Sequence, residues 1–136
     1  MGGGAGTYSL TNTELGQITA GSLTIGSANN GTITVDGVSF TSFPLTLVAS
    51  SGASAVNLST TASSFNSLTL DTGTGGVSFE SNLSTADLSV TSGGTITDTG
   101  ALTITGTSSF TTDVANQVIT LDNTSNAFTG AVNLNT

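Results

Sequence analysis

Residues 88–104, LSVTSGGTITDTGALTI, contain the pattern that decides the fold of this chain. Apolar and hydroxyl residues alternate at positions 88–90 and 102–104, a third short run opens at Ile96, and clusters of Gly, Ser, Thr and Asp separate the runs. Alternation with a period of two is typical of a β-strand with one buried face, and such clusters are typical of turns. The stretch therefore predicts three short strands that are joined by tight corners.

The same three-run unit recurs along the chain. The first runs open at nearly regular intervals, at Leu23, Leu45, Leu68, Leu88, Phe110 and Val132. The second runs open at Ile33, Val56, Val77, Ile96 and Ile119, and the third near Val38, Phe65, Leu83, Leu102 and Phe128. A period of about 22 residues indicates a solenoid, in which each strand pairs in parallel with its equivalent one turn along.

We therefore predict an all-β fold, a parallel β-helix (β-solenoid) with three short strands per turn, about 22 residues per turn and five to six turns. An antiparallel sandwich of the immunoglobulin type is the alternative, because it also has short alternating strands, and Asn30-Gly31 is a hairpin signal. The repeat at every third strand, together with six Phe and no Trp, favours the solenoid.

The chain is expected to form a single repetitive unit. Residues 1–7 are interpreted as a flexible, linker-like start and residues 8–136 as one β-helical segment of a longer rod. The start lacks the basic and apolar regions of a secretion signal, and no run approaches the ~18 apolar residues of a membrane-spanning helix. One turn buries too little apolar surface to fold alone, so both ends are expected to expose unpaired strand edges. The expected partners are neighbouring turns of a parent chain, or another copy that associates through these open ends.

The chain has no Lys, Arg, His or Cys, and its formal net charge is −8. Binding to nucleic acid depends on basic residues, and so does attraction to anionic membranes, so neither partner is expected. Without a basic side chain or a thiol, the remaining catalytic groups are a carboxylate pair or a serine without a base. We predict no enzymatic activity, no cofactor, no metal site and no membrane insertion. We interpret all the acidic residues as solvated groups at turns: Glu14, Asp36, Asp71, Glu80, Asp87, Asp98, Asp113 and Asp122.

Residues 71–76, DTGTGG, are faintly similar to a calcium-binding repeat. Oxygen atoms are the only ligands that the chain offers to a cation, but the Gly-Gly-x-Gly-x-Asp order of the calcium nonapeptide is missing. A corner explains the stretch better, with Gly75-Gly76 supplying positive φ values.

The candidate surface site is a column of outward-facing residues in the first runs. In each run the outer two residues of a triplet point inward and the middle one points outward. This pattern predicts an exposed Thr/Ser column that consists of Thr24, Thr46, Thr69, Ser89, Thr111 and Asn133. The hydroxyl and amide groups of such a column suit either a carbohydrate- or surface-binding face or a ladder of Thr that binds ice. Pro44 and Asp87 interrupt the flat second row that an ice-binding face requires.

Three stretches resemble the central repeats of filamentous-haemagglutinin-type exoproteins, the large adhesins of Gram-negative bacteria that use two-partner secretion. They are residues 15–25 (LGQITAGSLTI), 91–106 (TSGGTITDTGALTITG) and 119–123 (ITLDN), and the likeness covers most of residues 15–134. It is compositional, so it specifies architecture better than function. The Asn-Pro motifs of the family's secretion domain are missing, since the only proline, Pro44, follows Phe43.

The resemblance implies a right-handed β-helical shaft that is secreted or displayed on the bacterial cell surface. Its expected function is that of a rigid spacer, which holds an adhesive tip with a host-surface or glycan ligand away from the cell. A self-assembling fibre, in which solenoids stack end to end, is a second interpretation. A carbohydrate- or surface-binding module, or an ice-binding face, is a third.

Overall fold

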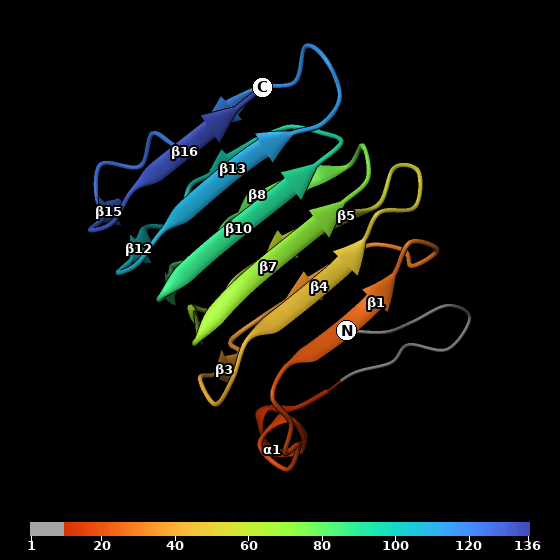
Figure 1. Cartoon of the computed structure of the whole chain (residues 1–136), viewed down its shortest axis with the longest axis vertical. Coiled ribbons are helices and arrows are strands. Elements are labelled where there is room, and N and C mark those ends of the chain that lie inside the picture. Colours follow the sequence, from red (N-terminus) through yellow and green to blue (C-terminus); the bar gives the residue numbers. More distant parts are fainter. Residues whose placement is uncertain (1–9) are drawn as a thin grey trace.

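The computed structural model describes residues 10–136, in which one short helix precedes three parallel β-sheets. Residues 1–7, which are expected to form a linker-like start, lie outside this range. The helix α1 (Asn12–Leu15) is followed by strands that belong in turn to sheets A, B and C, and then to sheet A again. Each circuit through the three sheets is one turn of a coil (Figure 1).

Each sheet collects every third strand of the chain. Sheet A contains β1 (Leu23–Ser27), β4 (Leu45–Ala49), β7 (Ser67–Thr72), β10 (Asp87–Ser92), β13 (Ser108–Thr112) and β16 (Val132–Asn135). Sheet B contains β2 (Ile33–Val35), β5 (Ala55–Leu58), β8 (Gly76–Phe79), β11 (Ile96–Asp98) and β14 (Ile119–Thr120). Sheet C contains β3 (Ser39–Phe40), β6 (Ser63–Phe65), β9 (Leu83–Thr85), β12 (Leu102–Ile104) and β15 (Ala127–Phe128).

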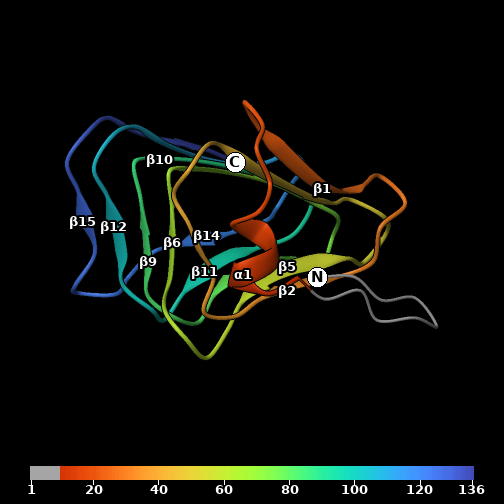
Figure 2. The ribbon, with the colours of Figure 1, turned by 90° about the horizontal axis from the view of Figure 1, so that it is seen from below.

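These strands form a parallel β-solenoid of about five turns, with three strands and about 22 residues per turn. All the strand pairs within residues 10–136 are parallel, so the predicted fold class is confirmed and the antiparallel sandwich is wrong. Figure 2 shows the turns lying over one another with a roughly triangular outline. Neighbouring strands are about 4.8 Å apart, so the six strands of sheet A span a rod of about 24 Å.

The strand register corrects one of the predicted turn openings. The row that opens sheet A consists of Leu23, Leu45, Leu68, Leu88, Ser108 and Val132. The fifth turn therefore opens at Ser108 and not at Phe110. Ser108 is only 1% exposed, so a hydroxyl residue occupies an inward position that leucine occupies in four other turns. A pattern of apolar residues alone misplaces this opening by two residues.

The register of sheet B agrees with the sequence, whereas that of sheet C agrees only in part. The predicted openings of the second runs share one row: Ile33, Val56, Val77, Ile96 and Ile119. The predicted openings of the third runs mix two rows. Leu83 and Leu102 pair with each other, whereas Phe65 pairs with Phe40 and Phe128 pairs with Ile104. Short strands of two or three residues leave the period-two pattern too little length to fix a register.

The core is a narrow stack of side chains from the inner faces of the three sheets. Equivalent residues of successive turns lie over one another, as Leu47 does with Leu70 and Val56 with Val77, and all four are buried. Parallel pairing brings such residues within about 5 Å, so each apolar row is shielded mainly by the turns above and below it. The end turns depend on what covers them.

The corner between β7 and β8 requires glycine, as the sequence predicts for Gly76. Its φ is 80°, a left-handed conformation that side chains with a Cβ disfavour, and a Cβ there would lie 2.2 Å from the carbonyl oxygen of Thr95. Gly75 has no positive φ, but its Cβ would lie 2.4 Å from the carbonyl oxygen of Ala53. Close approach of the next turn, in addition to backbone conformation, therefore selects glycine at this corner.

Candidate functional site

The site predicted from the sequence is an outward-facing row in sheet A. The register places six residues in this row: Thr24, Thr46, Thr69, Ser89, Ser109 and Asn133. Five predicted members are thus brought together on one face. Thr111 is not part of the row, because β13 starts at Ser108 and pairs Thr111 with Thr91; Ser109 takes its place.

The second outward row of sheet A changes in chemistry from turn to turn. It consists of Gly26, Val48, Asp71, Thr91, Thr111 and Asn135. Only two of these residues are Thr, and Asp71 places a charge in the middle of the row. Sheet A therefore does not present two matched rows of Thr, which is the arrangement that the ice-binding interpretation needs.

Each of the other two sheets also presents one hydroxyl-rich outward row, which the sequence analysis did not single out. The row on sheet B consists of Thr34, Asn57, Ser78, Thr97 and Thr120. The row on sheet C consists of Ser39, Ser64, Ser84, Thr103 and Ala127. Neither row contains a charged residue. The three faces of the solenoid therefore offer hydrogen-bonding groups in lines that run along the rod.

Asp98 is an exception to the prediction that all the acidic residues are solvated groups at turns. It lies in β11, pairs with the buried Phe79 and is itself only 4% exposed. Its Oδ1 accepts a hydrogen bond of 2.9 Å from the backbone N–H of Asp122, and the side-chain amide of Asn126 donates to its Oδ2. The Oδ1 of Asn126 accepts in turn from the backbone N–H of Leu102, at 2.8 Å. This network joins the last turn to the turn before it.

A shallow hollow at a corner between sheets A and B brings two other acids near each other. Asp71 and Asp113 line it together with Gly73 and Gly93, and its volume is about 270 Å³. Within residues 10–136 there is no group of three or more His, Cys, Asp or Glu side chains that could hold a metal ion. Two carboxylates at an open hollow are solvated surface groups rather than a built site.

The helix α1 covers the N-terminal end of the solenoid. Thr11 and Glu14 form a capping box: the hydroxyl of Thr11 accepts from the backbone N–H of Glu14, and the carboxylate of Glu14 accepts from the backbone N–H of Thr11. Leu15 is 1% exposed and packs on the core. In Figure 2, α1 lies over the interior of the coil. We expected both ends of the solenoid to be open. At the N-terminal end this is wrong for the interior, which α1 covers, and for the edge of sheet C, as the next paragraph describes.

One side chain of α1 replaces a strand at the edge of sheet C. The Nδ2 of Asn12 donates to the carbonyl oxygen of Gly37 at 2.9 Å, and its Oδ1 accepts from the backbone N–H of Ser39 at 3.0 Å. A primary amide can donate and accept as a peptide group does, so Asn12 satisfies backbone groups that a preceding turn would otherwise bind. The edge of β3 is thus closed by a side chain.

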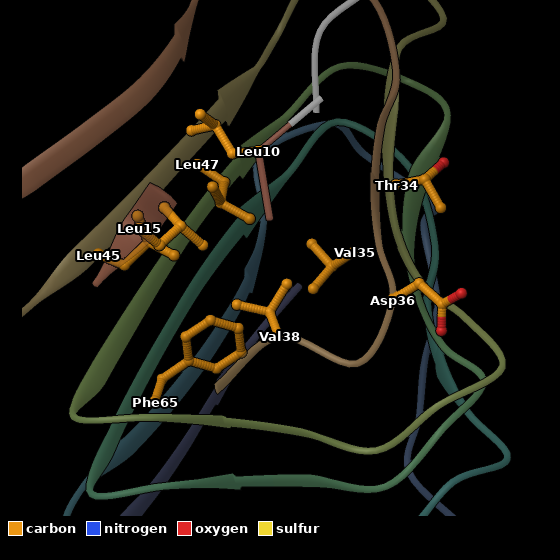
Figure 3. A pocket seen from close by; sticks show the side chains of 9 residues that line it. All are labelled: Leu10, Leu15, Thr34, Val35, Asp36, Val38, Leu45, Leu47 and Phe65. Atoms are coloured by element: carbon orange, nitrogen blue, oxygen red, sulfur yellow. The ribbon is translucent and has the colours of Figure 1, made fainter. Parts of the chain in front are cut away.

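A cavity of about 140 Å³ lies between α1 and the first turns. Figure 3 shows the side chains of Leu10, Leu15, Val35 and Val38 around it, whereas the side chain of Asp36 points away. The four side chains around the space are apolar, so they offer no hydrogen bond that could orient a substrate. Its position under the cap indicates imperfect packing at the end of the core.

The C-terminal end is built differently, because nothing in the described part of the chain covers it. Strands β14, β15 and β16 each have a hydrogen-bonded neighbour on one side only. Leu134 and Val118 are 61% and 56% exposed, and Val132 is also exposed. Phe128 keeps one edge-to-face contact with Phe110, with the ring centroids 6.2 Å apart. This end therefore matches the expectation of unpaired edges and bare apolar side chains.

Two buried hydroxyls lie beneath the last turn. Ser108 Oγ and Thr112 Oγ1 of β13 are buried and have no hydrogen-bond partner within residues 10–136. A buried polar group without a partner costs about 1–3 kcal/mol. The strand that supports the last turn is therefore packed less favourably than β10, where the hydroxyl of Ser92 accepts from Thr72 and donates to Gly94.

The one resolved pKa shift is that of Glu14, whose pKa is lowered because the backbone N–H and the hydroxyl of Thr11 donate hydrogen bonds to its carboxylate, at 2.8 and 2.9 Å. These bonds serve the helix cap. Between residues 10 and 136, no helix is long and apolar enough to span a bilayer.

A family model described as repeats of unknown function (DUF5649) matches residues 66–135, which extend from the start of β7 to β16. The match covers just over half of the chain, and its repetitive character agrees with the coil. No curated protein and no solved structure matches the chain.

Proposed function

This chain belongs to the family of repeats of unknown function DUF5649, and we propose that it acts as a rigid structural spacer. It is then a segment of the β-solenoid shaft of a secreted or surface-displayed bacterial adhesin or exoprotein of the filamentous-haemagglutinin type. The observation that carries the proposal is the unbroken parallel pairing of six strands in sheet A. Such a ladder fixes the distance between its two ends, because every turn is bonded to the next along a whole strand.

The surface chemistry supports a spacer rather than an enzyme. The sequence has no Lys, Arg, His or Cys, so neither a nucleophile activated by His or Lys nor a thiolate can form. The outward rows of sheets B and C are uncharged and rich in hydroxyl groups, which keep the rod solvated without forming a large apolar patch on its sides.

The spacer proposal predicts that length follows the number of turns. Spin labels on cysteines in a Thr24→Cys, Asn133→Cys double variant mark the two ends of one row, and the natural chain has no cysteine that would interfere. Duplication of residues 68–87 adds one turn in register, because Leu68 pairs with Leu88. The label separation, measured by electron spin resonance in samples diluted with unlabelled chain, should increase by about 4.8 Å and stay narrowly distributed.

A matched control inserts the same number of Gly and Ser residues after Ala115, in the exposed corner between β13 and β14. This insertion adds chain but no strand, so the label separation should not change. A broad distribution in the unmodified rod, or equal lengthening by both insertions, would overturn the proposal of a rigid spacer.

Location is tested separately from stiffness. Antibodies raised against this segment should label intact cells of the native source, or their culture medium, if the segment is displayed or secreted. Labelling only after the cells are lysed would contradict the location but not the rigidity.

A second candidate function is recognition of a carbohydrate or a surface by the lines of hydroxyl groups. The observation in its favour is that all three faces carry such a row, each with a repeat of about 4.8 Å along the rod. A specific hit on a glycan array that is lost when Ser84 and Thr103 are changed to Ala would support it. The absence of any hit would contradict carbohydrate binding, and zero thermal hysteresis would contradict ice binding. The spacer function would then be the remaining candidate.

A further inference from the structure

We propose that Asn30 is a modification site, at which the chain deamidates itself without an enzyme. The inference goes beyond the spacer function and does not depend on it. It starts from Asn30-Gly31, the only pair in the sequence in which Gly follows Asn. This pair is a hairpin signal, yet β1 and β2 on either side of it belong to different sheets and do not pair. The pair thus does not form the turn that it is typical of.

The backbone does not require glycine at position 31. Gly31 does not have a left-handed φ, and a Cβ at this position would meet no atom within 4 Å. Other corner glycines are different. A Cβ at Gly73 would lie 2.1 Å from the carbonyl oxygen of Gly52, and a Cβ at Gly94 would lie 2.4 Å from that of Thr74. Close approach of the neighbouring turn therefore selects glycine at those corners but not at position 31.

The side chain of Asn30 is folded toward the residue that follows it. The backbone N–H of Asn30 donates to the carbonyl oxygen of Ser27 at 2.9 Å, and its Nδ2 donates to the carbonyl oxygen of Gly31, also at 2.9 Å. Among the described residues, no acceptor binds the N–H of Gly31, which is exposed and lies outside the strands. The nitrogen of Gly31 can thus approach the Cγ of Asn30 without breaking a bond to the rest of the coil.

The reaction is a ring closure followed by hydrolysis. The nitrogen of Gly31 loses its proton to hydroxide and attacks the Cγ of Asn30, so that a C–N bond forms and Nδ2 leaves as ammonia. The attack is intramolecular, and glycine has no Cβ to hinder it. The resulting succinimide takes up one water molecule, which opens the ring at either of its two carbonyl groups. The products are aspartate and isoaspartate, and water is the only co-reactant.

The pair Asp36-Gly37 shows how the fold prevents the same ring closure. It is the only pair in the sequence in which Gly follows Asp. The N–H of Gly37 donates to the carbonyl oxygen of Thr61 at 3.2 Å, and the Oδ1 of Asp36 accepts from the N–H of Thr61 at 2.9 Å. The next turn therefore holds both groups that would have to react. Within the described residues, Asn30-Gly31 has neither bond, so one pair is protected and the other is not.

The corner tolerates the products of this reaction. The coil stays joined on both sides of it, because β1 pairs with β4 and β2 pairs with β5. The modification removes the hydrogen bond from Nδ2 to Gly31 and adds a carboxylate to a chain whose formal net charge is −8. Since only water is consumed, the modified fraction increases with the age of the chain.

Incubation of the purified full chain in mildly alkaline buffer tests the proposal. Mass spectrometry should find the first exchange of an amide for a carboxylate at Asn30, with isoaspartate at the same position. A protease that cuts beside acidic residues must replace trypsin, because the chain has no Lys or Arg. The rate should rise in proportion to the hydroxide concentration. No reaction at Asn30, or equal rates at several asparagines, would overturn the proposal.

Two matched glycine variants test the role of Gly31. Gly31→Ala should slow the reaction by about tenfold or more, because its Cβ hinders the attacking nitrogen. Far-UV circular dichroism should be unchanged, because the fold has room for this Cβ. Gly21→Ala is the control, since a Cβ there also meets no atom within 4 Å but the residue follows Ala20. Equal rates in the two variants would contradict an attack by the nitrogen of Gly31.

Unfolding separates the effect of the fold from that of the sequence. In denaturant Asp36-Gly37 loses both of its bonds to Thr61, so isoaspartate should then appear at Asp36 as well. The rate at Asn30 should change little, because no bond to another turn holds Gly31 in the folded chain. A large acceleration at Asn30 in denaturant would show that the folded corner protects this pair too, and would overturn the proposal.

Discussion

The two ends of this solenoid use leucine in opposite ways. At the N-terminal end, Leu15 is 1% exposed because α1 carries it onto the core, whereas at the C-terminal end Leu134 is 61% exposed although it occupies an inward position of sheet A. The same residue type is thus structural at one end and available for contact at the other. In a coil whose turns shield one another, the burial of a side chain depends less on its residue type than on whether another turn or a cap covers it.

The largest expected effect contrasts these two leucines. Leu15→Ala should lower the free energy of unfolding by about 2–5 kcal/mol, because it deletes a buried side chain beside an existing cavity. Leu134→Ala should change it by about 0.5 kcal/mol or less, because that side chain is mostly in water. Denaturant unfolding followed by far-UV circular dichroism, at a concentration where the chain is monomeric, measures both. Similar losses of unfolding free energy in the two variants would contradict the difference in burial between Leu15 and Leu134.

A somewhat smaller effect is expected where the last turn is joined to the rest. Asp98→Ala leaves the amide of Asn126 and the backbone N–H of Asp122 without an acceptor, which should cost about 1–3 kcal/mol. The loss should be local, and hydrogen exchange should accelerate in residues 119–135 more than in β4 and β7. The exposed Asp113→Ala is the control and should leave these rates unchanged. Uniform acceleration along the rod would contradict the assignment of Asp98 to the last turn.

The side chain that closes sheet C gives a prediction for the cap. Asn12→Ala removes two hydrogen bonds to the edge of β3, and the expected loss of stability is about 1–2 kcal/mol. Once β3 is uncovered, end-to-end aggregation should also increase, which light scattering measures. Asn29→Ala, at an exposed corner, is the matched control. An unchanged stability would show that Asn12 does not act as a substitute strand.

The smallest effect concerns the pH dependence of the same cap. The pKa of Glu14 is lowered in the folded chain by hydrogen bonds from Thr11, so its contribution to stability is fully present above the unfolded pKa of about 4.5. It is lost as the pH falls through the lowered folded value. The difference in unfolding midpoint between wild type and Glu14→Gln should therefore shrink on acidification from pH 6 to pH 3. A constant difference would show that the carboxylate does not stabilise the cap.

The middle of the rod was predictable from sequence, and the ends were not. The row that starts at Ile33 follows from alternation alone, because every member is apolar and the corners between them hold turn residues. In sheet A the same pattern misplaced the fifth turn, because the inward position at its start is occupied by Ser108. A pattern of apolar residues cannot identify a buried residue that carries a hydroxyl. For this reason the observed row shares five residues with the predicted column and has Ser109 in place of Thr111.

The two features that set the character of the ends were missed for different reasons. The cap had a local signal, because Thr11 and Glu14 have the spacing of a capping box and precede Leu15, but four residues are too few for helical periodicity to show. The burial of Asp98 had no local signal. Its partner Asn126 is 28 residues away and becomes adjacent only when the register of the coil is known.

The unpaired hydroxyls of Ser108 and Thr112 have a consequence for how the rod comes apart under mechanical load. Both lie on β13, the strand from which β16 would be pulled first if the C-terminus were stretched. Parallel strands pulled from one end peel by breaking hydrogen bonds one after another, so the weakest seam yields first. We expect unravelling to begin between β13 and β16 and to advance turn by turn toward the capped end. The molecule would then release its length in steps and in one direction.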